Sequence, residues 1–205
     1  MIDNLKVTQV YHTQFLGIEI NSRLNWNEHI KTVCSKVCKS SGIWHRTRKN
    51  LNAGTLLLLY QTLIQPYFDY CNIIWSVGES VRLEKLFVKQ KKATRAITFA
   101  KWNANTDRLF ANLRLLKLDD INVYQTSSFI YKSRHGLLPP HFCNLIVLNS
   151  EVHLQDKRNK NLIHQVAHRI NARALSIRVY GAKIWNALPT FIQNSPTFPI
   201  FKKKM

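Results

Sequence analysis

Residues 26–100 contain three stretches in which apolar residues recur every three or four positions, and this spacing limits the fold more than any other feature. In the first stretch the repeating positions include Ile30, Val33, Val37 and Trp44. Side chains at this spacing share one face of an α-helix, so the stretch predicts an amphipathic helix that buries that face. Three such helices joined by short links predict a compact helical bundle.

The second stretch, residues 56–75, is apolar on nearly every side and is expected to be the most buried helix. Asn52 is suited to cap its start, because an Asn side chain can accept a hydrogen bond from an early helical N–H. Pro66 cannot donate a backbone hydrogen bond, so the helix is expected to divide near Gln65.

The third stretch begins after Ser80, a predicted N-cap. Its predicted core face is made of Leu83, Leu86, Phe87, Gln90, Ala93, Thr94 and Ile97. Gln90 and Thr94 are polar exceptions on this face, so its apolar character weakens toward the end.

The segments on either side of the bundle have different patterns. Alternating apolar residues at 15–20 predict a strand of a short β-hairpin, and Asn25 with Glu28 resembles a capping box for the first helix. After residue 100, Thr106 and Asp119 are expected to cap two further helices, and Gly136 to end the second. We therefore predict a mainly α fold: a hairpin in 1–25, a three-helix bundle in 26–100, and a smaller, basic helical and irregular region in 101–205.

The chain of 205 residues carries a formal charge of +19, and the charge is unevenly distributed. Residues 1–80 have eight basic and five acidic side chains, whereas residues 81–205 have twenty-two and six. Such a chain repels itself unless a polyanion neutralises it, and nucleic acid is the commonest such partner. No apolar run approaches the ~20 residues that span a bilayer, so a membrane partner is not expected. The first ten residues lack the pattern of a secretion signal, so we expect an intracellular protein, nuclear or cytoplasmic.

The third predicted helix carries the clearest charge pattern. We call Arg82, Lys85, Lys89 and Lys92 the basic stripe, because their spacing of three, four and three residues places them on one side of the helix. Lys91 and Arg95 flank it. Lys39, Arg46 and Arg48 of the first helix add to it more weakly, and for these a solvated face is at least as good an interpretation. A line of cations on a rigid helix suits the phosphates of a nucleic-acid strand, the alternative being a solvated basic face.

Other residue types give weaker signals. Cys34 and Cys38, with His164 and His168, have the spacing of a zinc site, but reduced and buried thiols explain the cysteines without metal. The adjacent Asp119 and Asp120 have the composition of a two-metal site but the position of a helix N-terminus, which favours acids. Trp102, in a polar linker, is the one tryptophan expected to be exposed. Its ring has two possible roles, stacking on a base and anchoring the loop, and anchoring is the favoured interpretation.

Five segments, taken in order, resemble the C-terminal part of the reverse transcriptase of LINE-type (non-LTR) retrotransposons, of the jockey-like kind. These segments are VTQVYHTQFLGIEINSRLNWNEHI, LLLLYQTLIQPYFDYCNIIW, LEKLFVKQKKATRAIT, FIYKSRHGLLPPHF, and VYGAKIWNALP with FKKKM. They cover nearly the whole chain, with 149–172 matching least.

The resemblance implies that Phe15, Leu16 and Gly17 belong to a primer-grip hairpin at the end of the palm, and that residues 26–100 form the thumb. It places the catalytic aspartates of the polymerase upstream of residue 1. The chain is thus expected to be a noncatalytic fragment that binds an RNA/DNA duplex through its backbones with little sequence specificity. No cofactor and no small-molecule ligand are expected, since Mg²⁺ would belong to the intact parent enzyme. Two alternatives stay open: a helical interaction or structural remnant that has lost nucleic acid, and the tail of an active reverse transcriptase.

Overall fold

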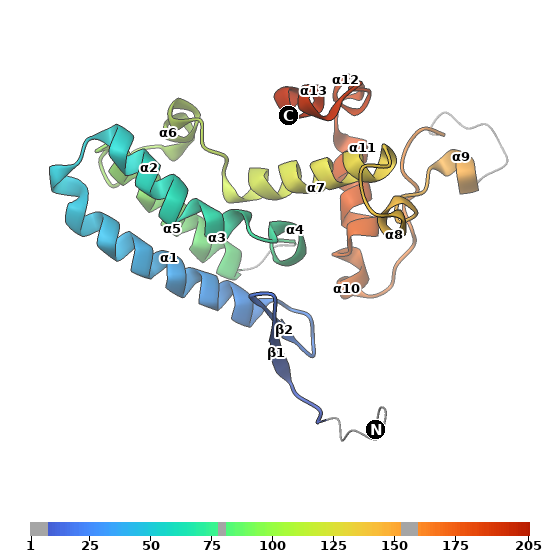
Figure 1. Cartoon of the computed structure of the whole chain (residues 1–205), viewed down its shortest axis with the longest axis horizontal. Coiled ribbons are helices and arrows are strands. Elements are labelled where there is room, and N and C mark those ends of the chain that lie inside the picture. The colour runs from blue at the N-terminus through green and yellow to red at the C-terminus, as the bar shows by residue number, and fades with distance from the viewer. Residues whose placement is uncertain (1–7, 78–80, 153–159) are drawn as a thin grey trace. The chain divides into compact units, whose positions relative to one another are not determined.

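The computed structural model describes residues 8–77, 81–152 and 160–205, which form two compact units. The first unit contains residues 8–71 and 81–118, and the second contains residues 72–77, 119–152 and 160–205. The predicted mainly α fold with an N-terminal hairpin is confirmed (Figure 1). No helix among these residues is long and apolar enough to cross a membrane.

The N-terminal hairpin pairs β1 (His12–Phe15) with β2 (Ile18–Asn21) in antiparallel register. Leu16 and Gly17 make the two-residue turn, with φ angles of 47° and 79°. Positive φ at both central positions is the geometry that matches the twist of the strands. The turn is attached to the bundle, because the Tyr70 hydroxyl donates a hydrogen bond to the Leu16 carbonyl. Ile18 is buried, and the Thr32 hydroxyl donates to the Glu19 carboxylate over 2.8 Å.

The turn gives a test of local stability. A Leu in the left-handed region costs roughly 1 kcal/mol, whereas Asn tolerates it, so Leu16→Asn is expected to stabilise the hairpin by up to ~1 kcal/mol. Gly17→Ala is expected to destabilise it by about as much. Hydrogen exchange of the β1 and β2 amides should slow in the first variant and accelerate in the second. Equal exchange rates in both variants would contradict this geometry.

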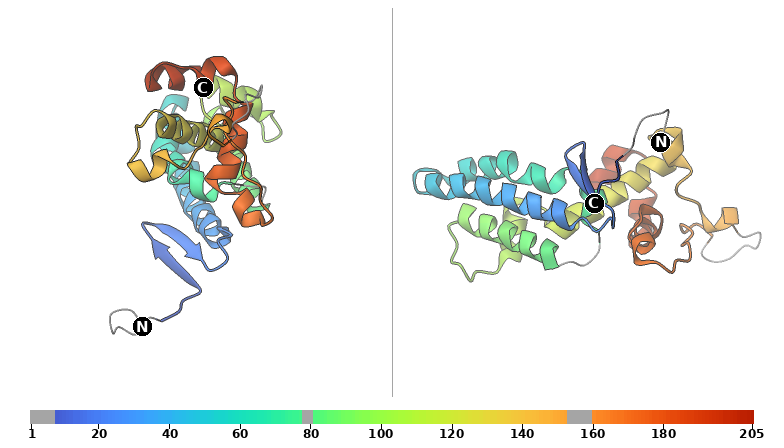
Figure 2. Two further views of the ribbon diagram at one scale, coloured as in Figure 1. Left: turned by 90° about the vertical axis from the view of Figure 1, so that its right-hand side faces the viewer. Right: turned by 90° about the horizontal axis from the view of Figure 1, so that it is seen from below.

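The bundle of the first unit consists of α1 (Asn27–Thr47), α2 (Ala53–Leu63), α3 (Gln65–Asp69) and α5 (Val81–Ile97). α1, α2 and α5 contact one another and lie side by side in the right-hand view of Figure 2. The predicted division at Pro66 is confirmed, since α2 ends at Leu63 and Pro66 lies in the first turn of α3. Asn52 caps α2 as predicted, by accepting from the Thr55 N–H over 2.8 Å. Ser80 lies outside the residues that the structure describes.

The predicted capping box of α1 is wrong. The N-cap residue is Trp26, with a φ of 53°, and its side chain makes no capping hydrogen bond. Asn25 instead accepts from the N–H of Asn27 over 3.2 Å, and Glu28 forms a 3.6 Å ion pair with Lys31. A left-handed residue at the helix start redirects the chain, so the Asn lies one residue too early to cap.

His29, in the first turn of α1, is a buried titratable group. Its Nδ1 accepts the Glu19 backbone N–H over 3.4 Å. Burial lowers the pKa of His29 below its ordinary value, Lys36 lowers it further, and the Glu19 carboxylate partly opposes both. The folded state therefore favours the neutral ring.

This lowered pKa predicts a pH dependence of stability. Unfolded His29 takes up a proton near pH ~6.5 while the folded ring stays neutral, so the unfolded state binds more protons below that pH. The free energy of unfolding is expected to decrease as the pH falls from ~6.5 through the lower folded pKa, relative to a His29→Gln variant. Denaturant titrations between pH ~5 and ~7.5 measure the difference. Parallel curves for the two proteins would contradict it.

Gln90 is fully buried on the core face of α5, where the sequence shows a polar exception. Its Nε2 donates to the Tyr60 hydroxyl over 3.0 Å and to the Leu116 carbonyl over 2.9 Å. Its Oε1 accepts from the N–H of Leu118 over 3.0 Å. One side chain thus joins α2, α5 and the start of α7 (Leu118–Arg134). The burial of Tyr60 raises the pKa of its phenol, which stays a neutral hydrogen-bonding group.

Two short helices complete the first unit, and the first of them is the 3-10 helix η1 (Arg48–Asn50), directly after α1. α6 (Thr106–Leu113) packs on α5, where the rings of Phe87 and Phe110 stack at 6.3 Å. The predicted Thr106 cap is wrong by one residue, because the Asn105 side chain accepts from the Asp107 N–H. Thr106 is the first helical residue instead.

The second unit contains α4 (Asn72–Trp75), most of α7, and the helices that follow it. These are α8 (Pro140–Cys143), α9 (Asn149–Val152), α10 (Asn171–Ala174), the π-helix η2 (Ile177–Gly181), α11 (Ala182–Ala187), α12 (Thr190–Gln193) and α13 (Phe198–Lys204). Its core packs Tyr131 of α7 against Phe201 of α13 and Trp185 of α11. The Tyr131 hydroxyl donates to the Ser195 carbonyl over 2.9 Å, and Gly136 follows α7 with a φ of 65°.

Candidate nucleic-acid interface

The basic stripe lies on α5 beside its core face. Leu86, Ala93 and Ile97 point into the core and are buried. Within the stripe, Lys85 and Lys92 are exposed, while Arg82 and Lys89 are half-buried. Half-buried cations of this length cover apolar surface with their stems and keep the charged group near water.

The stripe runs alongside α1. Burial raises the pKa of the Cys34 thiol on α1, while Lys89 and, more weakly, Lys85 lower it, so these ammonium groups lie near that thiol. Further along, Lys92 lines a cavity together with His45 and Arg48, which lie at the end of α1. The N-terminal half of α5 therefore faces the N-terminal half of α1, and the C-terminal half of α5 faces the C-terminal end of α1. The helices run in parallel, and Arg48, the C-cap residue of α1, adds a cationic side chain beside the stripe.

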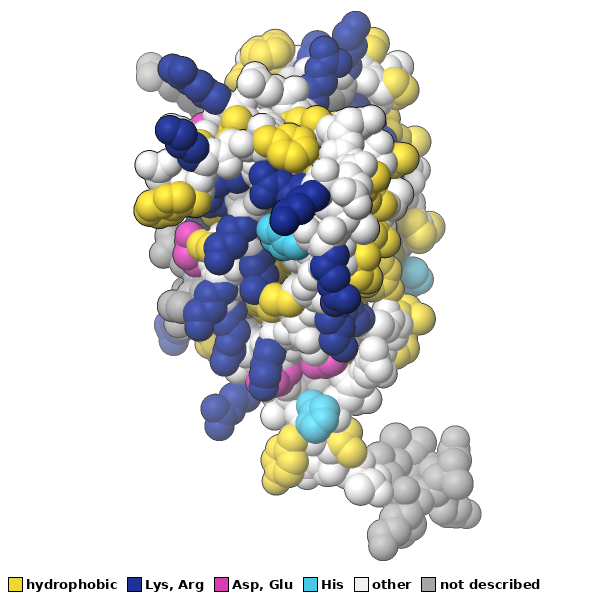
Figure 3. Space-filling model, turned by 90° about the vertical axis from the view of Figure 1, so that its left-hand side faces the viewer, with side chains coloured by type: hydrophobic (Ala, Val, Ile, Leu, Met, Phe, Trp, Pro, Cys, Tyr) yellow, Lys and Arg dark blue, Asp and Glu magenta, His cyan; other side chains and the backbone are white. Residues whose placement is uncertain are grey.

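Acidic side chains are scarce next to the stripe. The ion pairs in the described ranges join Glu28 to Lys31, Glu84 to Lys91, and Asp107 to Lys117. Within the same ranges, none of the stripe residues forms an ion pair. Figure 3 shows a face on which Lys and Arg side chains gather with few acids between them. Neighbouring cations without acids destabilise a fold unless an anion binds, so the arrangement favours phosphate contact.

Of the two predicted flanking residues, the structure brings only Arg95 to the stripe. Arg95 lines the same cavity as Lys92. Lys91 points elsewhere: its Nζ lies 4.0 Å from a Glu84 carboxylate oxygen and 4.0 Å from the centre of the Phe87 ring. It also helps Lys117 to lower the pKa of Asp107 in α6. Lys91 is thus partly neutralised on the α6 side of α5.

Lys39 and Arg46 are not brought together with the stripe. Each follows a buried core residue of α1 by two positions, Val37 and Trp44 respectively. Two residues turn an α-helix by ~200°, so both cations lie on its outer face. Both are exposed there.

The tip of the hairpin presents apolar side chains to water. Phe15 is 63% exposed and Leu16 is 74% exposed. Gly17 lies against Tyr70, since a Cβ placed on it would be 3.8 Å from the Tyr70 ring. The contacts of the turn are thus made with the end of α3, and the strands rest on α1.

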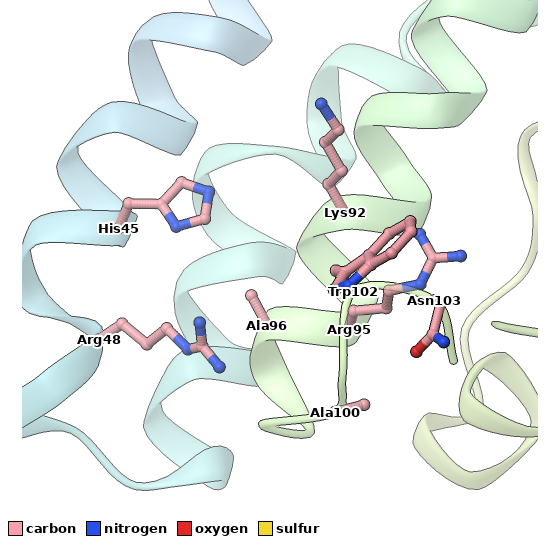
Figure 4. Close-up of a pocket in the computed structure, with 8 residues that line it drawn as sticks. All are labelled: His45, Arg48, Lys92, Arg95, Ala96, Ala100, Trp102 and Asn103. Atoms are coloured by element: carbon pink, nitrogen blue, oxygen red, sulfur yellow. The ribbon is translucent and has the colours of Figure 1, made fainter. Parts of the chain in front are cut away.

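The cavity at the end of the stripe has a volume of about 600 Å³ (Figure 4). His45 and Arg48 extend from α1 on one side, and Lys92 and Arg95 extend from α5 on the other. Trp102 lies beside Arg95 and is 87% exposed. The favoured expectation that this indole anchors its loop is therefore wrong, because an anchoring side chain would be buried.

The cysteine, histidine and aspartate side chains considered above as possible metal ligands do not form a common site. The four cysteines are free, and the expectation of buried thiols is wrong, because Cys38 is exposed and the other three are only half-buried. His164 and His168 lie in a non-helical segment, so their spacing does not place them one helical turn apart. In the described ranges, no group of three His, Cys, Asp or Glu side chains could hold a metal ion. Asp119 and Asp120 lie in the first turn of α7, the position expected for acids at a helix N-terminus. The predicted Asp119 cap is wrong, because α7 already begins at Leu118 and Asp119 is a helical residue.

About half of the chain is similar in sequence to a known polymerase. It is 25% identical over 111 residues to the RNA-directed DNA polymerase from mobile element jockey of Drosophila melanogaster. The match covers 52% of this chain and 12% of that polymerase, so the chain spans a small part of its relative's length. No family model and no solved structure matches the chain. The sequence match shows that the chain is distantly related to a retrotransposon RNA-directed DNA polymerase.

Proposed function

We propose that this chain binds the sugar-phosphate backbones of an RNA/DNA duplex, as a noncatalytic part of a retrotransposon reverse transcriptase. The observation that carries the proposal is the basic stripe on α5, continued by Arg95 and by Arg48 at the C-cap of α1. An RNA-directed DNA polymerase synthesises DNA on an RNA template, and the product of that reaction is an RNA/DNA duplex. The distant relationship to such a polymerase is the reason for proposing this kind of duplex as the ligand. Contacts to phosphates carry no sequence information, so binding is nonspecific in sequence.

The bundle of α1, α2 and α5 acts in this proposal as the thumb. A rigid helix holds its cations at fixed spacing, which suits the regular spacing of phosphates along one strand. The hairpin tip at Phe15, Leu16 and Gly17 acts as the primer-grip element. Its exposed apolar side chains suit contact with sugars at the end of a primer, and the hydrogen bond from Tyr70 keeps the tip on the bundle.

The chain by itself catalyses no polymerisation in this proposal. The adjacent acids Asp119 and Asp120 are accounted for by the first turn of α7, where they interact favourably with the helix dipole.

Fluorescence anisotropy with labelled RNA/DNA duplexes of unrelated sequence tests the proposal. We expect similar affinities for all of them, together with no primer extension when nucleotides and Mg²⁺ are added. Extension of the primer would contradict the noncatalytic role. No binding of any duplex, with salt-independent association with a protein instead, would favour the interaction or structural alternative.

A further inference from the structure

One wall of the cavity at the end of the basic stripe is the indole of Trp102. This side chain is 87% exposed, although large aromatic side chains usually bury most of their surface. The cavity volume of about 600 Å³ lies within the ~300–1,000 Å³ typical of small-molecule sites. Ala96 and Ala100 line the cavity with small side chains. There is thus room beside the indole for a flat group the size of a nucleobase.

The loop that carries Trp102 is held by other residues. α5 ends at Ile97, Phe99 follows in the left-handed region at a φ of 54°, and the Ala100 N–H donates to the Arg95 carbonyl over 2.9 Å. The Arg95 side chain then returns to the loop, where its Nε donates to the Ala104 carbonyl over 3.0 Å. Trp102 is therefore positioned without burying its ring, which leaves a face of the indole available to a ligand.

Cations surround the same space. The Arg48 guanidinium lies 5.0 Å from the centre of the Phe99 ring, and its Nε is buried with no hydrogen-bond partner. His45 packs edge-on against Trp44 at 5.1 Å, which fixes the direction of its ring. Neither Asp nor Glu is among the described residues that line the cavity. An exposed indole ringed by cations, without acids, matches the two halves of a nucleotide: an aromatic base and a phosphate.

We propose that this cavity binds an unpaired nucleotide, with its base stacked on Trp102 and its flanking phosphates on Arg48 and Lys92. The inference rests on the proposed duplex binding, since the unpaired nucleotide arrives as a single-stranded extension of a duplex held along the stripe. Every base has a π-face, so the cavity accepts any base.

The test compares one RNA/DNA duplex in blunt form with the same duplex carrying a single-stranded extension of about five nucleotides, close to the smallest usual single-strand site. The extension is made as DNA and as RNA, with 2-aminopurine as the reporting base. We expect the extension to raise the affinity about tenfold, as one stacked base does, and the wild-type protein to quench 2-aminopurine. Trp102→Ala should abolish the gain and the quenching while leaving blunt-duplex affinity unchanged. Trp102→Phe should keep most of both.

Because Trp102 is exposed, its replacement should not unfold the protein. Tyr11→Ala serves as the control, since it removes a similarly exposed aromatic ring from outside the cavity. That control should keep the full gain. Equal affinities for blunt and extended duplexes, or a gain that survives Trp102→Ala, would overturn the nucleotide site and leave duplex binding intact. Failure to bind either duplex would overturn both proposals.

Discussion

The double substitution Lys85→Glu and Lys92→Glu is expected to weaken binding to an RNA/DNA duplex by about hundredfold or more at low salt. Each change removes an attraction and adds a repulsion, and a pair of unit charges at ~4 Å in water interacts by ~1 kcal/mol. Two reversals therefore cost up to ~4 kcal/mol before screening. Both side chains are exposed, so the fold should persist. Anisotropy titrations measure the loss, and circular dichroism checks the helices.

The matched control is Lys39→Glu with Arg46→Glu. It changes the net charge by the same amount, on exposed positions of a neighbouring helix. These positions lie on the outer face of α1, so the loss should be several-fold at most. Equal losses in the two double variants would show that only the total charge matters and that the stripe is not the interface.

The replacement Gln90→Leu is expected to reduce the free energy of unfolding by roughly 2–5 kcal/mol. The change leaves the buried Tyr60 hydroxyl and the Leu118 N–H without the partner that each has over 3.0 Å. A buried polar group that loses its hydrogen bond costs ~1–3 kcal/mol. Urea denaturation measures the total, and the Leu118 amide should lose its protection from hydrogen exchange.

Thr94→Val is the matched control for this prediction. Thr94 is fully buried on the same face of α5, but its hydroxyl donates to the Gln90 carbonyl of its own helix. Its loss leaves the contacts between α2, α5 and α7 intact, so the cost should stay near ~1 kcal/mol. A Gln90→Leu variant no less stable than Thr94→Val would contradict the connecting role of Gln90.

Much of the helical architecture could be predicted because it depends on local rules. Helical spacing identified α1 and α5, and the missing N–H of Pro66 identified the break between α2 and α3. The start of α1 was mispredicted although Asn25 and Glu28 have the right spacing. The left-handed Trp26 intervenes, and its conformation follows from the turn that brings β2 against α1.

The candidate interface was predictable in part. The four stripe residues could be identified from the spacing within one helix. The same spacing could have shown that Lys91 points away from the stripe, since it lies two positions after Lys89 and seven after Glu84. The outward direction of Lys39 could likewise have been found, since it follows Val37 by two.

Arg48 was predicted as a weak contributor, but no local signal placed it and His45 in one cavity with the stripe. His45 and Arg48 meet Lys92 and Arg95 only because α1 and α5 pack directly against each other in parallel, with α2 against both of them. Gln90 was visible as an exception, but its partners are 26 to 30 residues away in sequence. Tertiary packing supplies both features.

The salt dependence of duplex affinity tests the central claim most directly. Each phosphate neutralised by a bound cation contributes a slope of about −0.9 to a plot of log affinity against log salt concentration. The four stripe residues on phosphates give the wild-type protein a slope of about −4 on an RNA/DNA duplex, which contacts by Arg95 and Arg48 make steeper. Lys85→Glu with Lys92→Glu should give a slope shallower by about two. A flat plot, or an unchanged slope in the double variant, would contradict the stripe as the duplex-binding surface.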